Sequence, residues 1–198
     1  MSLTLVTAPT VEPLTLADAK LQCRVFDSDH NEDDLLDSLI VAARQYAELY
    51  TGRALCTQTW DDKRDTFPCY SDETIWLPKP PVASVTSLSY IDTAGATQVW
   101  AASNYLTDLP SGTWAGRARI TPAYAVTYPL TRSVMNAVTI RVVCGYGAAS
   151  AVPEPIKAAM RLLIGTWFEN RSAVNVGTSV TPMPMAVDAL LWPFKVFE

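Results

Sequence analysis

The feature that most constrains the fold is one amphipathic stretch that begins at Asp33 and ends at Gly52. Its apolar residues recur at the i, i+3, i+4 and i+7 spacing of one helical face; they are Leu35, Leu36, Leu39, Ile40, Ala43, Tyr46, Ala47 and Tyr50. Asn31 can cap the start, and Asp33, Asp34 and Asp37 add negative charge near the positive end of the helix dipole. Gly52 can adopt the left-handed conformation that ends a helix. The pattern predicts a helix of about 18 residues with one face in a core.

Composition predicts a single domain over residues 1–198. The chain has 198 residues, of which 49% are hydrophobic and 18% are charged. A chain of this size can bury about 70% of its unfolded surface. The net charge of −5 comes mostly from residues 1–52, which carry three Lys and Arg against nine Asp and Glu. Because proteins that grip DNA phosphates carry a basic face, this charge disfavours tight DNA binding.

Neither a secretory signal nor a membrane span is expected. The N-terminal segment has no basic region followed by a long apolar run. Arg161 interrupts the best candidate for a membrane span, which needs about 20 apolar residues. Four scattered cysteines without a C-x-x-C pair favour free thiols in a reducing cytoplasm over disulfides or a zinc site.

Two N-terminal helices are predicted within residues 15–52. The first runs from Leu16 to about Arg24, because Thr15 and Asp18 stand at capping-box spacing. A period of two then replaces the helical period over residues 57–144, which predicts a β-rich insertion. Its strands are expected at Val85–Ile91 with Thr97–Trp100 paired back to it, at residues 138–142, and more weakly at Thr74–Leu77 and Arg117–Ile120.

A later helix is predicted over residues 153–171. Pro153 and Pro155 suit its first turn, and its apolar residues leave only a thin polar stripe, so it is expected to form a core or an interface. Residues 172–198 are predicted to hold a flexible segment and a short helix from Pro184 to about Leu191. The expected fold class is α+β: a mostly helical core that carries an inserted small antiparallel β region.

The acidic segment before the long helix invites comparison with a calcium-binding EF-hand loop. Asp27, Asp29 and Asn31 match its first, third and fifth positions. Glu32 replaces the required glycine at the sixth position, and Ser38 replaces the bidentate glutamate at the twelfth. These departures favour a solvated loop, so no metal site is predicted.

No catalytic constellation stands out either. His30 is the only histidine, and it falls in a polar loop, which favours a surface role. The acidic residues Asp61, Asp62 and Asp65 alternate with basic ones, which is typical of a solvated strand or loop, although a glycosidase pair stays open. Four tryptophans fall in the β region, where packing and sugar binding are the alternatives; they are Trp60, Trp76, Trp100 and Trp114.

An ordered set of motifs over nearly the whole chain resembles the head–tail connector proteins of tailed bacteriophages, also catalogued as head-completion or putative DNA-packaging proteins. The motifs are LTLADAKLQCRV, DDLLDSLIVAARQYAELYTGRAL, TW, LPKPPVASVTSLSYIDTAG, VTIRVVCGYG, VPEPIKAAMRLLIGTWFENRSA and ALLWPFK. The segment from about Thr57 to Cys144 is longer than in the compact, mostly helical members.

The resemblance implies a structural protein without catalysis, cofactor or metal. Such proteins form a ring beneath the portal, extend the DNA channel and dock tail-completion proteins. Double-stranded DNA would pass through without sequence-specific binding, and the location would be the virion head–tail junction, with the host cytoplasm during assembly. The alternatives are a DNA-binding packaging factor and a carbohydrate-binding or carbohydrate-active protein that uses the β insertion.

Candidate residues for the oligomer or partner interface follow from the motifs and from the aromatic C-terminus. Those that match the family pattern are Arg44, Tyr46, Glu48, Arg53, Trp167, Glu169 and Arg171. Trp192 and Phe194 are added because an aromatic cluster near a chain end can form a docking patch.

Overall fold

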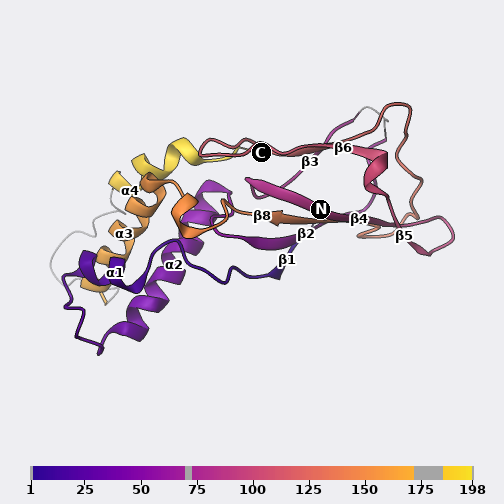
Figure 1. Cartoon of the computed structure of the whole chain (residues 1–198). Coiled ribbons are helices and arrows are strands. Elements are labelled where there is room, and N and C mark those ends of the chain that lie inside the picture. Colours follow the sequence, from indigo (N-terminus) through magenta and orange to yellow (C-terminus); the bar gives the residue numbers. More distant parts are fainter. Residues whose placement is uncertain (1, 70–72, 172–184, 198) are drawn as a thin grey trace. The chain divides into compact units, whose positions relative to one another are not determined.

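The computed structural model describes residues 2–69, 73–171 and 185–197, and its chain divides between two compact units (Figure 1). The β unit contains residues 1–10 and 56–147, and the helical unit contains residues 11–55 and 148–198. Each unit is therefore assembled from two separate stretches of the chain.

Four α-helices make up the helical unit in the described part of the chain. They are α1 (Leu16–Cys23), α2 (Asp33–Thr51), α3 (Glu154–Glu169) and α4 (Met185–Leu191), with 3₁₀ turns at Ala149–Ala151 and Trp192–Phe194. Helix α3 packs against the other three. Its fully buried face includes Ile156, Met160 and Ile164, and α2 opposes it with Leu36 and Ile40. The apolar periodicities of both long helices therefore predicted the core of this unit correctly.

The helix ends agree with the sequence at two of three places. Thr15 and Asp18 form the predicted capping box of α1. Gly52 ends α2 in the left-handed conformation, with φ of 73°. The expectation that Asn31 caps α2 is wrong, because the cap position falls on Glu32 and no side chain bonds the free N–H groups there. Asn31 instead donates to Asp29, and the bonds within that turn hold its side chain away from the helix.

A five-stranded antiparallel sheet forms the larger part of the β unit. Its strands are β1 (Ser2–Thr7), β2 (Gln58–Arg64), β4 (Val82–Ile91), β5 (Thr97–Val99) and β8 (Val138–Cys144), in the order β1-β2-β8-β4-β5. Figure 1 shows these strands lying side by side. The central strand β8 alternates between buried and half-buried residues, as its sequence predicted. The hairpin of β4 and β5 is also confirmed.

A second, three-stranded antiparallel sheet completes the β unit. It contains β3 (Ile75–Trp76), β6 (Tyr105–Asp108) and β7 (Arg119–Pro122) in the order β3-β7-β6, and a 3₁₀ turn at Ala102–Asn104 precedes β6. Ile75, Ile120 and Tyr105 are buried on one face of it. Tyr105 stacks on Trp100, with 5.4 Å between ring centroids, and Trp100 in turn contacts Phe67 at 5.6 Å. Aromatic packing thus forms a core of its own in the β unit.

The expectation of a mostly helical core with a small β insertion is wrong. Over the described residues the structure holds four α-helices and eight strands in two antiparallel sheets, with 33% helix and 24% strand, so the fold is α+β without helical dominance. One reason is β2, which was interpreted as a solvated strand or loop. Asp62 is fully buried and Asp61 nearly so, because β2 pairs with β1 on one side and β8 on the other. The charged residues of β2 therefore led to its interpretation as a solvent-exposed segment, although it is an internal strand.

Candidate docking surfaces

Arg44 and Glu48, two of the predicted interface residues, lie inside the helical unit. Both residues are at most 9% exposed. Arg44 Nε donates to Glu12 at 2.7 Å, and its Nη1 donates to Glu48 at 2.9 Å. The other oxygen of Glu48 accepts the backbone N–H of Leu55 at 2.9 Å. Hydrogen bonds to the two carboxylates raise the pKa of Arg44 against the opposing effect of burial. The network fixes how the chain leaves α2.

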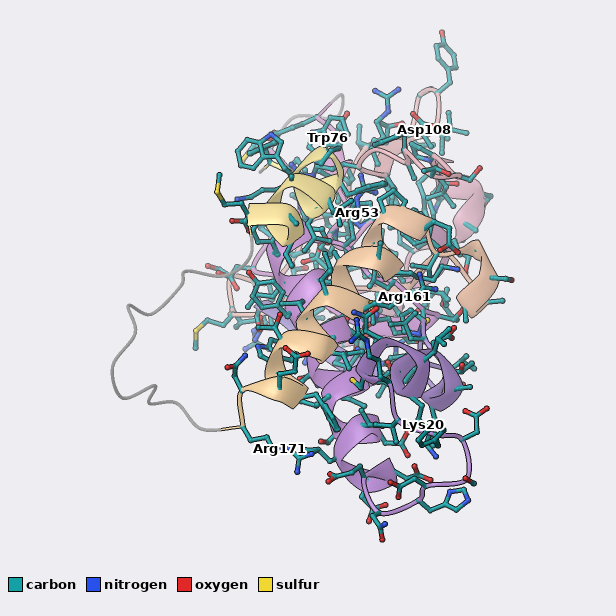
Figure 2. The ribbon with its side chains drawn as sticks, turned by 90° about the vertical axis from the view of Figure 1, so that its left-hand side faces the viewer. Lys20, Arg53, Trp76, Asp108, Arg161 and Arg171 are labelled. Atoms are coloured by element: carbon teal, nitrogen blue, oxygen red, sulfur yellow. The ribbon has the colours of Figure 1, made fainter. Side chains whose placement is uncertain are left out.

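Arg53 and Phe194 join the end of α2 to the C-terminal segment. Arg53 is 5% exposed, and its Nε donates to the backbone carbonyl of Phe194 at 2.6 Å (Arg53 is labelled in Figure 2). The Phe194 ring is 1% exposed. One turn further on, Val196 N–H donates to the carbonyl of Thr51 at 2.8 Å. These bonds hold the chain after α4 against α2, so Phe194 positions a surface and does not itself present one.

The residues around this junction form an exposed aromatic surface. We call it the aromatic surface and define it as Tyr46, Leu49, Tyr50, Trp192, Lys195 and Phe197. Leu49 is 80% exposed, Trp192 57% and Phe197 63%. The Nζ of Lys195 lies 5.4 Å from the ring centroid of Tyr50, 5.6 Å from that of Trp192 and 5.7 Å from that of Phe197. One cation thus stands among three rings, which is a favourable cation–π arrangement.

Helix α3 adds one aromatic residue beside this surface and two charged residues at its own end. Trp167 meets the Tyr46 ring edge-on, with 6.4 Å between centroids. Glu169 is exposed. Arg171 pairs with Glu32 at 3.0 Å and lies over the Phe168 ring at 4.7 Å (Figure 2). The predicted residues therefore divide into a buried set that shapes the unit and a half-buried or exposed set that other molecules can touch.

Four residues of the aromatic surface were not among the predicted interface residues: Leu49, Tyr50, Lys195 and Phe197. Leu49 lies outside the apolar face that defines α2, and that departure from periodicity was the available signal. Lys195 comes close to Tyr50 only through the tertiary pairing of α2 with the C-terminal segment, for which the sequence has no local signal.

The acidic loop before α2 is organised by a buried lysine. Lys20 is 4% exposed, and its Nζ donates to the carbonyls of Asp27 at 3.3 Å and Asp29 at 2.8 Å. The same ammonium pairs with Asp33 at 2.6 Å (Lys20 is labelled in Figure 2). His30 is exposed and hydrogen-bonds Asp33 at 2.8 Å. The ammonium of Lys20 thus supplies a positive charge to the loop that was compared with a calcium-binding loop. Among the described residues, no set of three potential ligands could hold a metal ion.

The tryptophans of the β unit do not share one surface. Trp100 is 6% exposed and packs among Phe67, Tyr105 and Tyr128. Trp76 and Trp114 are 43% and 67% exposed. Burial raises the pKa of Tyr128 to about 12, which fits a packing role. No described helix is long and apolar enough to span a membrane.

Comparison with known proteins now adds to this geometry. Residues 13–105 match the family model of phage gp6-like head-tail connector proteins. Three solved chains match over 100% of this chain and 97% of their own. They come from the virion of the native gene transfer agent (GTA) particle (27% identity, TM-score 0.80), the neck of the empty GTA particle computed with C6 symmetry (27%, 0.78) and the neck of the native GTA particle computed with C12 symmetry (26%, 0.73).

The chain is a structural head–tail connector. The resemblance to that family is confirmed, and the connector is a virion structural protein of the head–tail junction. A search of curated proteins finds no match. The matched family is one of head-tail connector proteins, and two of the matched structures are necks of GTA particles.

Proposed function

We propose that the connector assembles as a ring beneath the portal of a DNA-filled head, extends the channel for double-stranded DNA and docks a tail-completion protein. The match that covers the whole chain and nearly the whole length of neck chains is the observation that carries this proposal. Those neck structures were computed with sixfold and twelvefold symmetry, as a closed ring of identical chains would allow. The ring has no catalytic activity of its own.

The aromatic surface is the proposed docking site for the portal or the tail-completion protein. Exposed Trp192 and Phe197 supply apolar area, and Lys195 supplies one positive charge in their midst. Aromatic residues in the centre of an interface commonly contribute much of its binding energy. A partner with apolar side chains and a carboxylate at its rim would complement this surface.

Passage of DNA without sequence-specific binding agrees with the charge of the connector. The helical unit carries eight Lys and Arg against thirteen Asp and Glu, which accounts for the whole net charge of −5, and the β unit carries seven of each. Tight binding by release of counterions needs many basic contacts, and strong attraction would slow a sliding duplex.

Assembly is tested by mass photometry and negative-stain microscopy of the purified connector, alone and with its portal protein. We expect closed rings of a defined subunit number. A chain that stays monomeric at high concentration and with portal present would contradict the ring.

Docking is tested with the double variant Trp192→Ala and Phe197→Ala. We expect its affinity for the portal or the tail-completion protein to fall by about tenfold or more, with little change in thermal stability. Tyr124→Ala is the matched control, because Tyr124 is a fully exposed aromatic residue of the β unit. Equal affinities of the two variants would mean that the aromatic surface does not dock either partner.

A further inference from the structure

One face of the three-stranded sheet is left open and carries both aromatic and basic side chains. Trp76 on β3, Arg119 on β7 and Asp108 on β6 are register partners across the three strands, so they form one row on the same face. Leu106, two residues before Asp108, points to that face as well and is 63% exposed. Figure 2 labels Trp76 and Asp108. The opposite face, with Ile75 and Ile120, is buried.

Two arginines lie against the Trp76 ring. The guanidinium carbons of Arg117 and Arg119 are 5.6 Å and 6.0 Å from its centroid. Arg119 also pairs with Asp108 at 2.9 Å. Within the described part of the chain, no carboxylate lies within ion-pair distance of Arg117. The face therefore offers the Trp76 ring, an exposed leucine and one positive charge that has no ion-pair partner among the described residues.

The helical unit offers a surface of the opposite kind at the start of α2. Asp34 and Asp37 are exposed, and neither has an ion-pair or hydrogen-bond partner among the described residues. The neighbouring Asp33 is already paired with Lys20. Phe26, in the turn before this helix, is 82% exposed. Unpaired carboxylates beside an exposed aromatic ring complement an unpaired arginine beside an exposed tryptophan.

We infer that the open face around Trp76 and Arg117 binds the α2 start, around Phe26 and Asp34, of a second copy of this chain. The inference rests on the proposed ring and names the two surfaces that close it. A contact between two different surfaces repeats head to tail, and this is the kind of contact that generates rings. Complementary charges would fix its register and orientation. A second copy is favoured over DNA because Asp108 already pairs with Arg119 on this face, which leaves Arg117 as its one unpaired cation among the described residues.

Charge reversal tests the pairing directly. Arg117→Glu breaks no ion pair within the described chain, and neither does the double variant Asp34→Arg with Asp37→Arg. Each variant should raise the concentration at which half of the protein is assembled by about tenfold or more. Arg132→Glu is the matched control, an exposed arginine of the β unit outside this sheet, and it should assemble as the wild type does.

Mixing the two reversed variants is the decisive measurement. In a head-to-tail ring, alternating copies create only native contacts and fully swapped contacts, so the mixture should regain assembly that neither variant shows alone. Failure of the mixture to assemble would overturn the inference.

The remaining outcomes separate this inference from the proposed function. A wild-type chain that never forms rings defeats the ring itself. Wild-type rings with unchanged assembly of both variants would leave the ring standing and overturn this pair of surfaces. If Arg117→Glu leaves assembly intact but weakens binding to a 20-base-pair DNA duplex, this face binds DNA and the inference is wrong.

Discussion

At the scale of single residues, two glycines that follow β8 differ in how the structure would respond to an added side chain. Gly145 ends β8 with φ of 117°, and a Cβ built there would overlap the carbonyl of Cys56. Gly147 has a similar φ of 101°, but nothing lies within 4 Å of its Cβ position. The two positions therefore separate the cost of backbone strain from the cost of steric overlap.

We expect Gly145→Ala to lower the free energy of unfolding by about 3 kcal/mol or more and Gly147→Ala by about 1–2 kcal/mol. Urea unfolding followed by tryptophan fluorescence measures both. Equal losses would show that the close approach of Cys56 to β8 gives way at little cost.

At the scale of elements, the end of α2 is held by Glu48. Its carboxylate accepts from Arg44 and from the Leu55 N–H, so its removal leaves two buried donors without that partner. We expect Glu48→Ala to cost about 2–4 kcal/mol of stability. Glu169→Ala, an exposed glutamate at the end of α3, should change stability by less than about 0.5 kcal/mol. A small loss for Glu48→Ala would mean that water readily replaces its carboxylate.

The pairing of β2 with β8 should depend on pH. Arg141 faces Asp61 across the two strands and donates to it twice, at 2.7 Å and 2.8 Å. These hydrogen bonds hold the pKa of Asp61 below its ordinary value of 3.8. A carboxylate with a lowered pKa stabilises the folded state fully above its unfolded pKa, and the contribution disappears as pH falls through the lower, folded value.

The contribution of Asp61 should therefore be fully present at neutral pH and should decline as the pH falls below about 4. Asp61→Asn should be less stable than the wild type at pH 7, and the difference should shrink at pH 3. Thermal unfolding between pH 3 and pH 7 measures it. A difference that does not change with pH would assign the effect to packing rather than to charge.

At the scale of the whole molecule, the charge distribution predicts how weakly the connector would bind DNA. The helical unit holds the entire excess of acid, and the β unit is neutral. We expect binding to a 20-base-pair duplex at ~150 mM salt to be weaker than about 0.1 mM, at or beyond the weak end of ordinary non-specific binding. Fluorescence anisotropy of a labelled duplex measures it. Micromolar affinity with a steep dependence on salt would favour the packaging-factor alternative.

The sequence predicted the helical unit well, because the local period of α2 and α3 reports directly which face is buried. It predicted β8 for the same reason. It did not predict β2 as an internal strand, because Asp61 and Asp62 are residue types that usually face solvent. In the structure they are paired with Arg141 and Arg64, and the sequence alone does not reveal that pairing. Only two of the six residues of the aromatic surface were named from the sequence, Tyr46 and Trp192, whereas Lys195 joins them through contacts that no local pattern encodes.

The central position of β8 has a consequence for how the chain matures during synthesis. Strand β8 pairs with both β2 and β4, so the five-stranded sheet lacks its central strand until residues 138–144 have left the ribosome. The helical unit waits longer still, because Leu191 and Phe194 belong to its core. A chain released early would lack both the finished core and the aromatic surface. Incomplete translation products would thus be unable to dock, because they lack the aromatic surface.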